Sequence, residues 1–248
     1  MVGMVTPPPI TIEDLECRFG RRRAVAGLSG TFAPGSLTAI VGPNGGGKTT
    51  LLRALAGLHP LHGGRIDRGG LAARQIALLP QASALDRSFP VTCGEVVALG
   101  AWGAMGAWGA APAGLDGQVE AALGEVGLHG FAARQVGALS AGQFQRVMFA
   151  RLILQDAPVL LLDEPTSAVD ARTEADLMAL IRAWHAEGRT IVAVLHDLEL
   201  VRATFPQTLL LAGEPVAWGP TANVLAPENR LRARLLAEAQ DTPRRRAA

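Results

Sequence analysis

The chain has 248 residues, of which 49% are hydrophobic, and a formal net charge of +1. This length allows one large core or a core with a subdomain, and the near-neutral charge lacks the basic excess of a nucleic-acid-binding protein. The two cysteines, Cys17 and Cys93, lie far apart without a CxxC motif, which argues against a disulfide framework or a thiolate metal site. No basic segment followed by an apolar run opens the chain, so we expect no secretory signal.

The first part of the chain, from Ile10 to about Phe32, consists of short alternating stretches and predicts an antiparallel flap at the edge of a sheet. Continuous apolar runs then recur along the chain, with helical segments between several of them. These runs are Leu37–Val41, Ile76–Leu79, Val159–Leu162, Ile191–Leu195 and Leu209–Leu211. Buried strands that alternate with helices indicate a parallel sheet covered on both faces. One of the helices is predicted from Thr49 to Leu58.

The pattern changes between Pro90 and Leu154, where two amphipathic helices are predicted around Val119–Val126 and Phe144–Leu152. We interpret this part as a helical subdomain inserted into an α/β core. The expected division of residues 1–248 is a core at about 10–84 and 155–215, a helical subdomain at about 85–154 and a C-terminal extension at about 216–248. The final residues, DTPRRRAA, are expected to form a disordered tail.

An uncharged stretch, Val96–Leu115, reaches the roughly 20 residues needed to cross a bilayer. Its small residues and Pro112 contribute little to insertion, so we expect it not to span a membrane. Glycines recur at every third position, at 100, 103, 106 and 109, with Trp102 and Trp108 between them. The stretch is either a flexible surface loop or a low-charge docking surface for a partner protein. In the second case, a charge at this surface, as in Ala104→Glu, should weaken the docking of that partner.

The sequence GPNGGGKTT at 42–50 matches the phosphate-binding pattern G-x-x-x-x-G-K-[ST]. Glycines in such a loop let successive backbone N–H groups point at a phosphate, and the following helix N-terminus adds partial positive charge. Lys48 would bridge the β- and γ-phosphates, and the Thr49 hydroxyl would ligate Mg²⁺. The rest of the predicted cradle consists of Gly42, Asn44, Gly45, Gly46, Gly47 and Thr50.

Lys48 is the only lysine among 23 basic residues. Because the chain uses arginine everywhere else, we infer that position 48 requires a compact ammonium group that a planar guanidinium cannot replace.

A second pattern, LLLDEP at 160–165, is an apolar strand that ends in two carboxylates. Asp163 is predicted to reach Mg²⁺ through water, and Glu164 to act as the general base on the attacking water. Side chains of adjacent strand residues point to opposite faces, so the two carboxylates can serve different partners.

A third pattern, ALSAGQFQR at 138–146, opens a helix with Ser140 in a capping position. It resembles the LSGGQ signature of ABC ATPases. The resemblance implies a P-loop NTPase (RecA-like) core with an antiparallel β edge and an inserted α-helical subdomain. It also implies that Ser140, Gly142 and Gln143 contact ATP bound to the opposite subunit, so that the active state is a homodimer with two ATP molecules at the interface.

Further motifs of the same family follow in the expected order over nearly the whole chain. Gln81 resembles the Q-loop glutamine, which senses Mg²⁺ and the γ-phosphate; Ser167–Asp170 resembles the D-loop that links the two sites; and His196 resembles the switch histidine. The chain departs from the family twice. Phe19 stands where the adenine-stacking aromatic is usually tyrosine, and could instead be a core residue. Ala141 replaces a signature glycine, and we expect its methyl group to slow dimer closure if the position needs a positive φ or a close approach to phosphate.

Residues 83–100, with FPVT at 89–92, resemble the corresponding part of zinc and manganese importer ATPases, and the C-terminal half resembles bacterial zinc-importer ATPases. This resemblance implies a membrane permease as partner, an extracytoplasmic metal-binding protein as an indirect partner, and a cytoplasmic location on the inner face of the membrane. The alternatives are another cargo, such as an iron chelate or haem, and an assembly factor without a permease. The sequence indicates no binding of nucleic acid and no site for the cargo metal in this chain.

Overall fold

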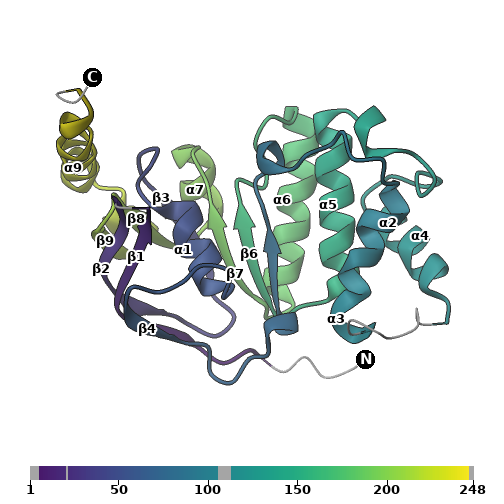
Figure 1. Ribbon diagram of the computed structural model, residues 1–248, viewed down its shortest axis with the longest axis horizontal. Helices are drawn as coiled ribbons and strands as arrows, with labels where there is room; N and C mark the ends of the chain where they lie inside the picture. The colour runs from purple at the N-terminus through teal and green to yellow at the C-terminus, as the bar shows by residue number, and fades with distance from the viewer. Residues whose placement is uncertain (1–5, 21, 106–112, 246–248) are drawn as a thin grey trace.

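The computed structural model describes residues 6–20, 22–105 and 113–245. Its strands are β1 (Ile10–Phe19), β2 (Arg22–Phe32), β3 (Leu37–Val41), β4 (Gly63–Asp67), β5 (Ile76–Leu79), β6 (Val159–Asp163), β7 (Thr190–Val194), β8 (Gln207–Leu211) and β9 (Pro215–Pro220). Its helices are α1 (Lys48–Leu55), α2 (Cys93–Ala98), α3 (Trp102–Met105), α4 (Leu115–Glu125), α5 (Ala141–Gln155), α6 (Ala171–Ala186), α7 (Leu198–Thr204), α8 (Thr221–Val224) and α9 (Pro227–Arg245). Figure 1 shows their arrangement.

The larger sheet has the strand order β5-β6-β7-β3-β8-β9. The pairs from β5 to β8 are parallel, and β9 pairs antiparallel with β8. All five predicted apolar runs are strands of this sheet, and their ends differ from the prediction by at most two residues. The predicted parallel sheet is therefore confirmed.

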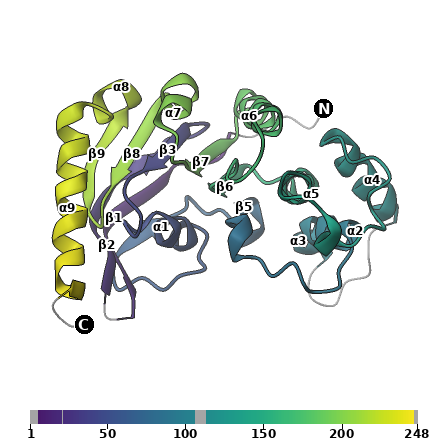
Figure 2. The ribbon, with the colours of Figure 1, turned by 90° about the horizontal axis from the view of Figure 1, so that it is seen from above.

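Both faces of this sheet are buried, because successive side chains of each strand enter different hydrophobic clusters. In β3, Ala39 and Val41 belong to a cluster that includes α5 and α6, whereas Ile40 belongs to a second cluster that includes α1, β1 and β2. Figure 2 shows α1 on the side of β1 and β2, and α5 and α6 on the other side. This packing holds β3, β6 and β7 rigidly side by side, so that their carboxyl ends lie at one edge.

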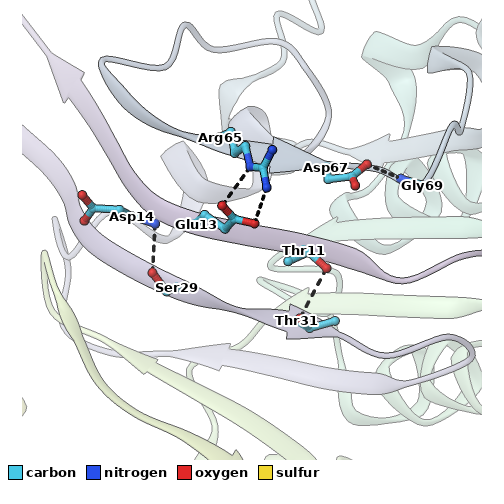
Figure 3. A network of polar contacts seen from close by, with 8 residues as sticks. All are labelled: Thr11, Glu13, Asp14, Ser29, Thr31, Arg65, Asp67 and Gly69. Carbon is cyan, nitrogen blue, oxygen red and sulfur yellow. Dashed lines mark hydrogen bonds and ion pairs between the residues drawn. The ribbon is translucent and has the colours of Figure 1, made fainter.

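The smaller sheet has the order β2-β1-β4, with antiparallel pairs throughout. Polar side chains of this sheet contact one another (Figure 3). Arg65 donates two hydrogen bonds of 2.8 and 2.7 Å to the Glu13 carboxylate. Both side chains are largely exposed, so this ion pair contributes little to stability. The predicted antiparallel flap is confirmed, and its strand β1 ends at Phe19.

Helices α2, α4 and α5 pack together beside the larger sheet. The two helices predicted here are confirmed, although α4 ends at Glu125 and Val126 serves as its C-cap. The partly buried Arg151 of α5 donates a 2.5 Å hydrogen bond to the carbonyl oxygen of Leu78 in β5, which connects the helices to the sheet. The division of the chain into a core, a helical subdomain and an extension remains a proposal.

Two predicted boundaries are wrong. Helix α1 ends at Leu55 and not at Leu58, because Gly57 adopts a left-handed conformation (φ 75°) and its N–H and that of Leu58 bond back to the carbonyls of Ala54 and Arg53. The expected C-terminal tail is helical to Arg245, as a continuation of α9. Arginine, leucine and alanine are good helix formers, and they dominate the preceding turns of α9.

The uncharged stretch is helical from its start through Met105. Gly106, Trp108 and Gly109 lie outside the described residues. The glycine at position 100 has a packing role, since a Cβ there would come within 2.4 Å of the Arg151 carbonyl oxygen. Leu99 and Trp102 are more than half exposed. Among the residues that the structure describes, no helix combines the length and apolar character needed to cross a bilayer.

Candidate nucleotide-binding site

The glycine-rich loop connects the buried strand β3 to α1, and Lys48 is the first residue of that helix. Gly47 caps the helix with a φ of 91°, and a Cβ at this position would lie only 2.0 Å from the Ala24 carbonyl oxygen. Only glycine allows both this conformation and this close approach of the two backbones. The loop is therefore held against β2 with its N–H groups at the helix N-terminus, as a phosphate cradle requires.

Lys48 is only 7% exposed, and its ammonium group donates hydrogen bonds of 2.9 and 3.0 Å to the carbonyl oxygens of Gly42 and Pro43. Burial lowers the pKa of Lys48, whereas the nearby charges of Glu164 and Asp163 oppose that shift. The inference that position 48 requires a compact ammonium group remains a prediction.

Asp163 ends β6 and is only 3% exposed. Burial raises the pKa of its carboxyl group, a hydrogen bond with Thr49 opposes that shift, and the charge of Glu164 adds to it. Among the described residues, its Oδ1 atom has no hydrogen-bond partner although it is buried. A buried carboxylate oxygen without a donor beside a threonine hydroxyl is a donor set that suits a hard cation such as Mg²⁺.

Glu164 follows Asp163 with a φ of 52°, a conformation that is uncommon for a residue other than glycine. Its carboxylate lies between two side chains: Gln81 Nε2 donates a 2.8 Å hydrogen bond to Oε2, and His196 Nε2 lies 2.6 Å from Oε1. Gln81 follows β5 and His196 follows β7. The strand ends thus bring together three residues that are more than 30 positions apart in the sequence.

A cavity of about 710 Å³, within the usual range for a small-molecule site, is lined by Lys48, Glu164, Gln81 and His196. Phe19 contributes to its wall and is 74% exposed, so it is not a core residue. Arg22 also lines the cavity and donates a 3.1 Å hydrogen bond to the Gly45 carbonyl oxygen. Arg22 was missed in the sequence, where only its place in the basic run 21–23 beside Phe19 could have indicated it. Asn44, Thr49 and Thr50 are among the other lining residues.

Ser140 caps α5 as predicted: its hydroxyl accepts from the Gln143 N–H at 3.2 Å, and the Gln143 side-chain oxygen accepts from the Ser140 N–H at 3.0 Å. The described lining of the Lys48 cavity includes none of Ser140, Gly142 and Gln143. Ala141 is the first residue of α5 and its φ is not positive, so the expected backbone cost of its methyl group is absent. Only a close approach to an external phosphate could still make this methyl group unfavourable.

The D-loop segment Ser167–Asp170 precedes α6, and the Asp170 carboxylate caps that helix by accepting from the Thr173 N–H at 2.9 Å. Ala168 adopts a left-handed conformation (φ 58°). The structure thus explains Asp170 as a helix cap, and a role for the segment in linking two nucleotide sites remains a proposal.

Residues 25–167 match the family model described as ABC transporter. The chain belongs to the ABC transporter family. The chain is 35% identical to the manganese transport system ATP-binding protein MntB of Halalkalibacterium halodurans, over 89% of this chain and 90% of that protein. It is 36% identical to the zinc transport system ATP-binding protein TroB of Treponema pallidum, over 88% of this chain and 84% of that protein.

The ABC fold extends over the structure as a whole. The ATP-binding cassette MJ1267 in its ADP conformation superimposes with a TM-score of 0.76, covering 91% of this chain and 98% of that chain at 21% identity. The chain is thus an ATP-binding ABC ATPase with a P-loop core, as the sequence predicted. The roles of its individual site residues remain predictions.

Proposed function

We propose that this ABC ATPase is the ATP-hydrolysing subunit of an importer for zinc or a related divalent metal, and that its turnover drives a separate membrane permease. The observation that supports the chemistry is the position of the Glu164 carboxylate, between Gln81 and His196 at the cavity that also contains Lys48. The similarity to the manganese and zinc transport proteins supports the class of cargo.

In this proposal, the loop N–H groups and Lys48 bind the phosphates of ATP, and Phe19 stacks on the adenine. Glu164 accepts a proton from the attacking water, since a carboxylate positioned by two neighbouring side chains can act as a general base without reorganising. His196 and Gln81 hold that carboxylate and contact the γ-phosphate.

Thr49, Asp163 and Gln81 would hold Mg²⁺, and the unpartnered Oδ1 atom of Asp163 supports this assignment. Bound there, the ion would neutralise negative charge on the phosphates. The chain itself supplies the buried carboxylate and hydroxyl that accept such a cation.

Two copies of the chain are needed in this proposal, because Ser140, Gly142 and Gln143 do not line the cavity of their own subunit. They would instead contact ATP in the second copy of a homodimer. A permease would hold the dimer at the inner face of the membrane, and an extracytoplasmic metal-binding protein would deliver the cargo to that permease.

The catalytic role of Glu164 is tested by Glu164→Gln, which keeps the shape of the side chain and removes the base. We expect ATP binding to persist, turnover to fall by two or more orders of magnitude, roughly the contribution of a general base, and a stable ATP-bound dimer to accumulate. Steady-state hydrolysis and sedimentation in MgATP measure these effects, with Lys48→Ala as the control that lacks hydrolysis and does not form the dimer. Unchanged turnover in Glu164→Gln would contradict the proposal.

The cargo is tested by growth of a deletion strain in medium depleted of one metal at a time. Rescue by zinc or manganese alone supports a divalent-metal importer. Rescue by haem or an iron chelate alone would assign another cargo, and normal growth in every depleted medium would favour an assembly factor.

A further inference from the structure

Gln81 lies in the loop after β5, and Ser140 lies at the start of α5. The side chain of Arg87 connects these two loops. We define the Q-loop as residues 81–92 and the signature loop as residues 136–140. We propose that Arg87 is a positioning residue that ties the Q-loop to the signature loop, so that the position of Ser140 depends on the position of Gln81. This inference rests on the proposed function, in which Ser140 acts on ATP in a second subunit.

The first observation is a pair of hydrogen bonds. The Nη2 atom of Arg87 donates to the carbonyl oxygen of Leu139, directly before the helix cap Ser140, and to that of Val136 at 3.4 Å. The Arg87 side chain is partly buried, whereas the side chains of its neighbours Asp86 and Ser88 are exposed. Together with the partly buried Leu85, the guanidinium therefore attaches this piece of chain to the helices.

A second contact fixes the same guanidinium to the signature helix. Its central carbon lies 5.0 Å from the centre of the Phe144 ring, and Phe144 is a buried residue in the second turn of α5. The flat group thus stacks on α5 with one face while its edge holds the signature loop, a combination that lysine cannot reproduce.

The chain beyond Arg87 is already attached to the helices. Val136 N–H bonds to the Val91 carbonyl at 3.0 Å, and Cys93 N–H bonds to the Arg134 carbonyl at 2.8 Å. At the other end of the Q-loop, Gln81 bonds to Glu164. Arg87 is therefore the point at which a displacement of the Q-loop reaches the residue just before Ser140.

The experiment compares chains that carry Glu164→Gln, with and without Arg87→Ala. We expect Arg87→Ala to raise the ATP concentration at half-maximal dimerisation at least about tenfold. ATP binding to the monomer and the melting temperature should stay close to those of the parent, a combination that loss of a purely structural brace would not produce. Sedimentation, equilibrium dialysis and thermal melting measure the three quantities.

Two further variants make the test specific. Arg134 stacks on Phe131 at 3.8 Å in the same group of helices, so Arg134→Ala is the matched control and should leave the midpoint unchanged. Arg87→Lys keeps the charge without the planar fork and should give an intermediate midpoint. If Arg87→Ala fails to fold, the lysine variant decides, and a midpoint equal to that of the parent overturns the inference.

A folded Arg87→Ala chain that dimerises at the midpoint of the parent also overturns the inference and leaves the proposed function intact. An equal shift in Arg134→Ala overturns it as well, because the effect would not be specific to the signature loop. A Glu164→Gln parent that does not dimerise in MgATP overturns the proposed function and, with it, the inference.

Discussion

Asp163 and Lys48 are buried charged groups that the fold accommodates at a cost. Each is more than nine-tenths buried. Burial favours the neutral form of each group, so it lowers the pKa of Lys48 and raises the pKa of Asp163. Each moderates the shift of the other, but Oδ1 of Asp163 still has no described hydrogen-bond partner. Such groups are retained for chemistry and not for stability.

The Asp163 carboxylate should therefore destabilise the nucleotide-free protein. Because its pKa is raised in the folded state, the folded chain binds the proton more tightly than the unfolded chain, and stability falls as the pH rises through the folded pKa. We expect Asp163→Asn to raise the melting temperature at pH 7 by about 2–4 °C, equivalent to about 1 kcal/mol.

The gain should shrink as the pH falls toward the ordinary aspartate value of 3.8. Thermal melting between pH 5 and about pH 8 measures the effect. In the same variant, MgATP should no longer raise the melting temperature. A lower melting temperature for Asp163→Asn at pH 7 would show that the carboxylate stabilises the fold.

In the first turn of helix α5, the glycine at position 142 is not explained by contacts within its own subunit. A Cβ added at Gly142 would lie 3.4 Å from the Thr173 hydroxyl oxygen, an ordinary van der Waals contact, and Gly142 has no positive φ. The subunit itself therefore does not require glycine at this position. In the proposed function, the requirement comes from the partner subunit's ATP.

Gly142→Ala should accordingly separate stability from dimerisation. Alanine is favoured over glycine inside a helix by up to about 1 kcal/mol, so the melting temperature should stay the same or rise. Dimerisation in MgATP should weaken about tenfold or more in the Glu164→Gln background. If the dimer forms as readily as in the parent, no phosphate approaches this glycine closely.

The elements were more predictable than their ends or their mutual contacts. Runs such as Val159–Leu162 are strands because a fully buried strand is apolar on both faces, a local property that the sequence displays. The end of α1 at Leu55 depends on a single glycine conformation, and the contact of Arg87 with Leu139 joins residues 52 positions apart. Arg22 was likewise missed, because only its place in the basic run 21–23 beside Phe19 separates it from a solvated arginine.

The segment from Phe89 to Trp102 presents large apolar side chains at the molecular surface. Phe89, Leu99 and Trp102 are each more than half exposed. At the far side of the molecule, α9 packs on β8 and β9 (Figure 2). It lines a second cavity of about 760 Å³, whose wall also includes Gly42 and Pro43. The sequence did not predict that helix.

A charge placed in the exposed apolar segment from Phe89 to Trp102 should affect transport and not the ATPase activity of the isolated chain. We expect Trp102→Glu to retain the ATPase rate of the purified chain and to abolish metal uptake in cells, because a buried unpaired charge opposes docking. The control is Leu231→Glu, which changes a residue of similar exposure on α9. Normal uptake in Trp102→Glu would exclude this surface as the permease contact.

Because Lys48 is the only lysine, chemical labelling of lysine can report on the phosphate loop alone. Apart from the amino terminus, the only primary amine lies inside the phosphate loop, and its lowered pKa leaves more of it unprotonated and nucleophilic than an ordinary lysine. An acylating reagent would thus tag a single side chain, and bound nucleotide would shield it. Footprinting at this position could follow nucleotide occupancy in the purified chain, because the chain has no surface lysines whose labels would hide the signal.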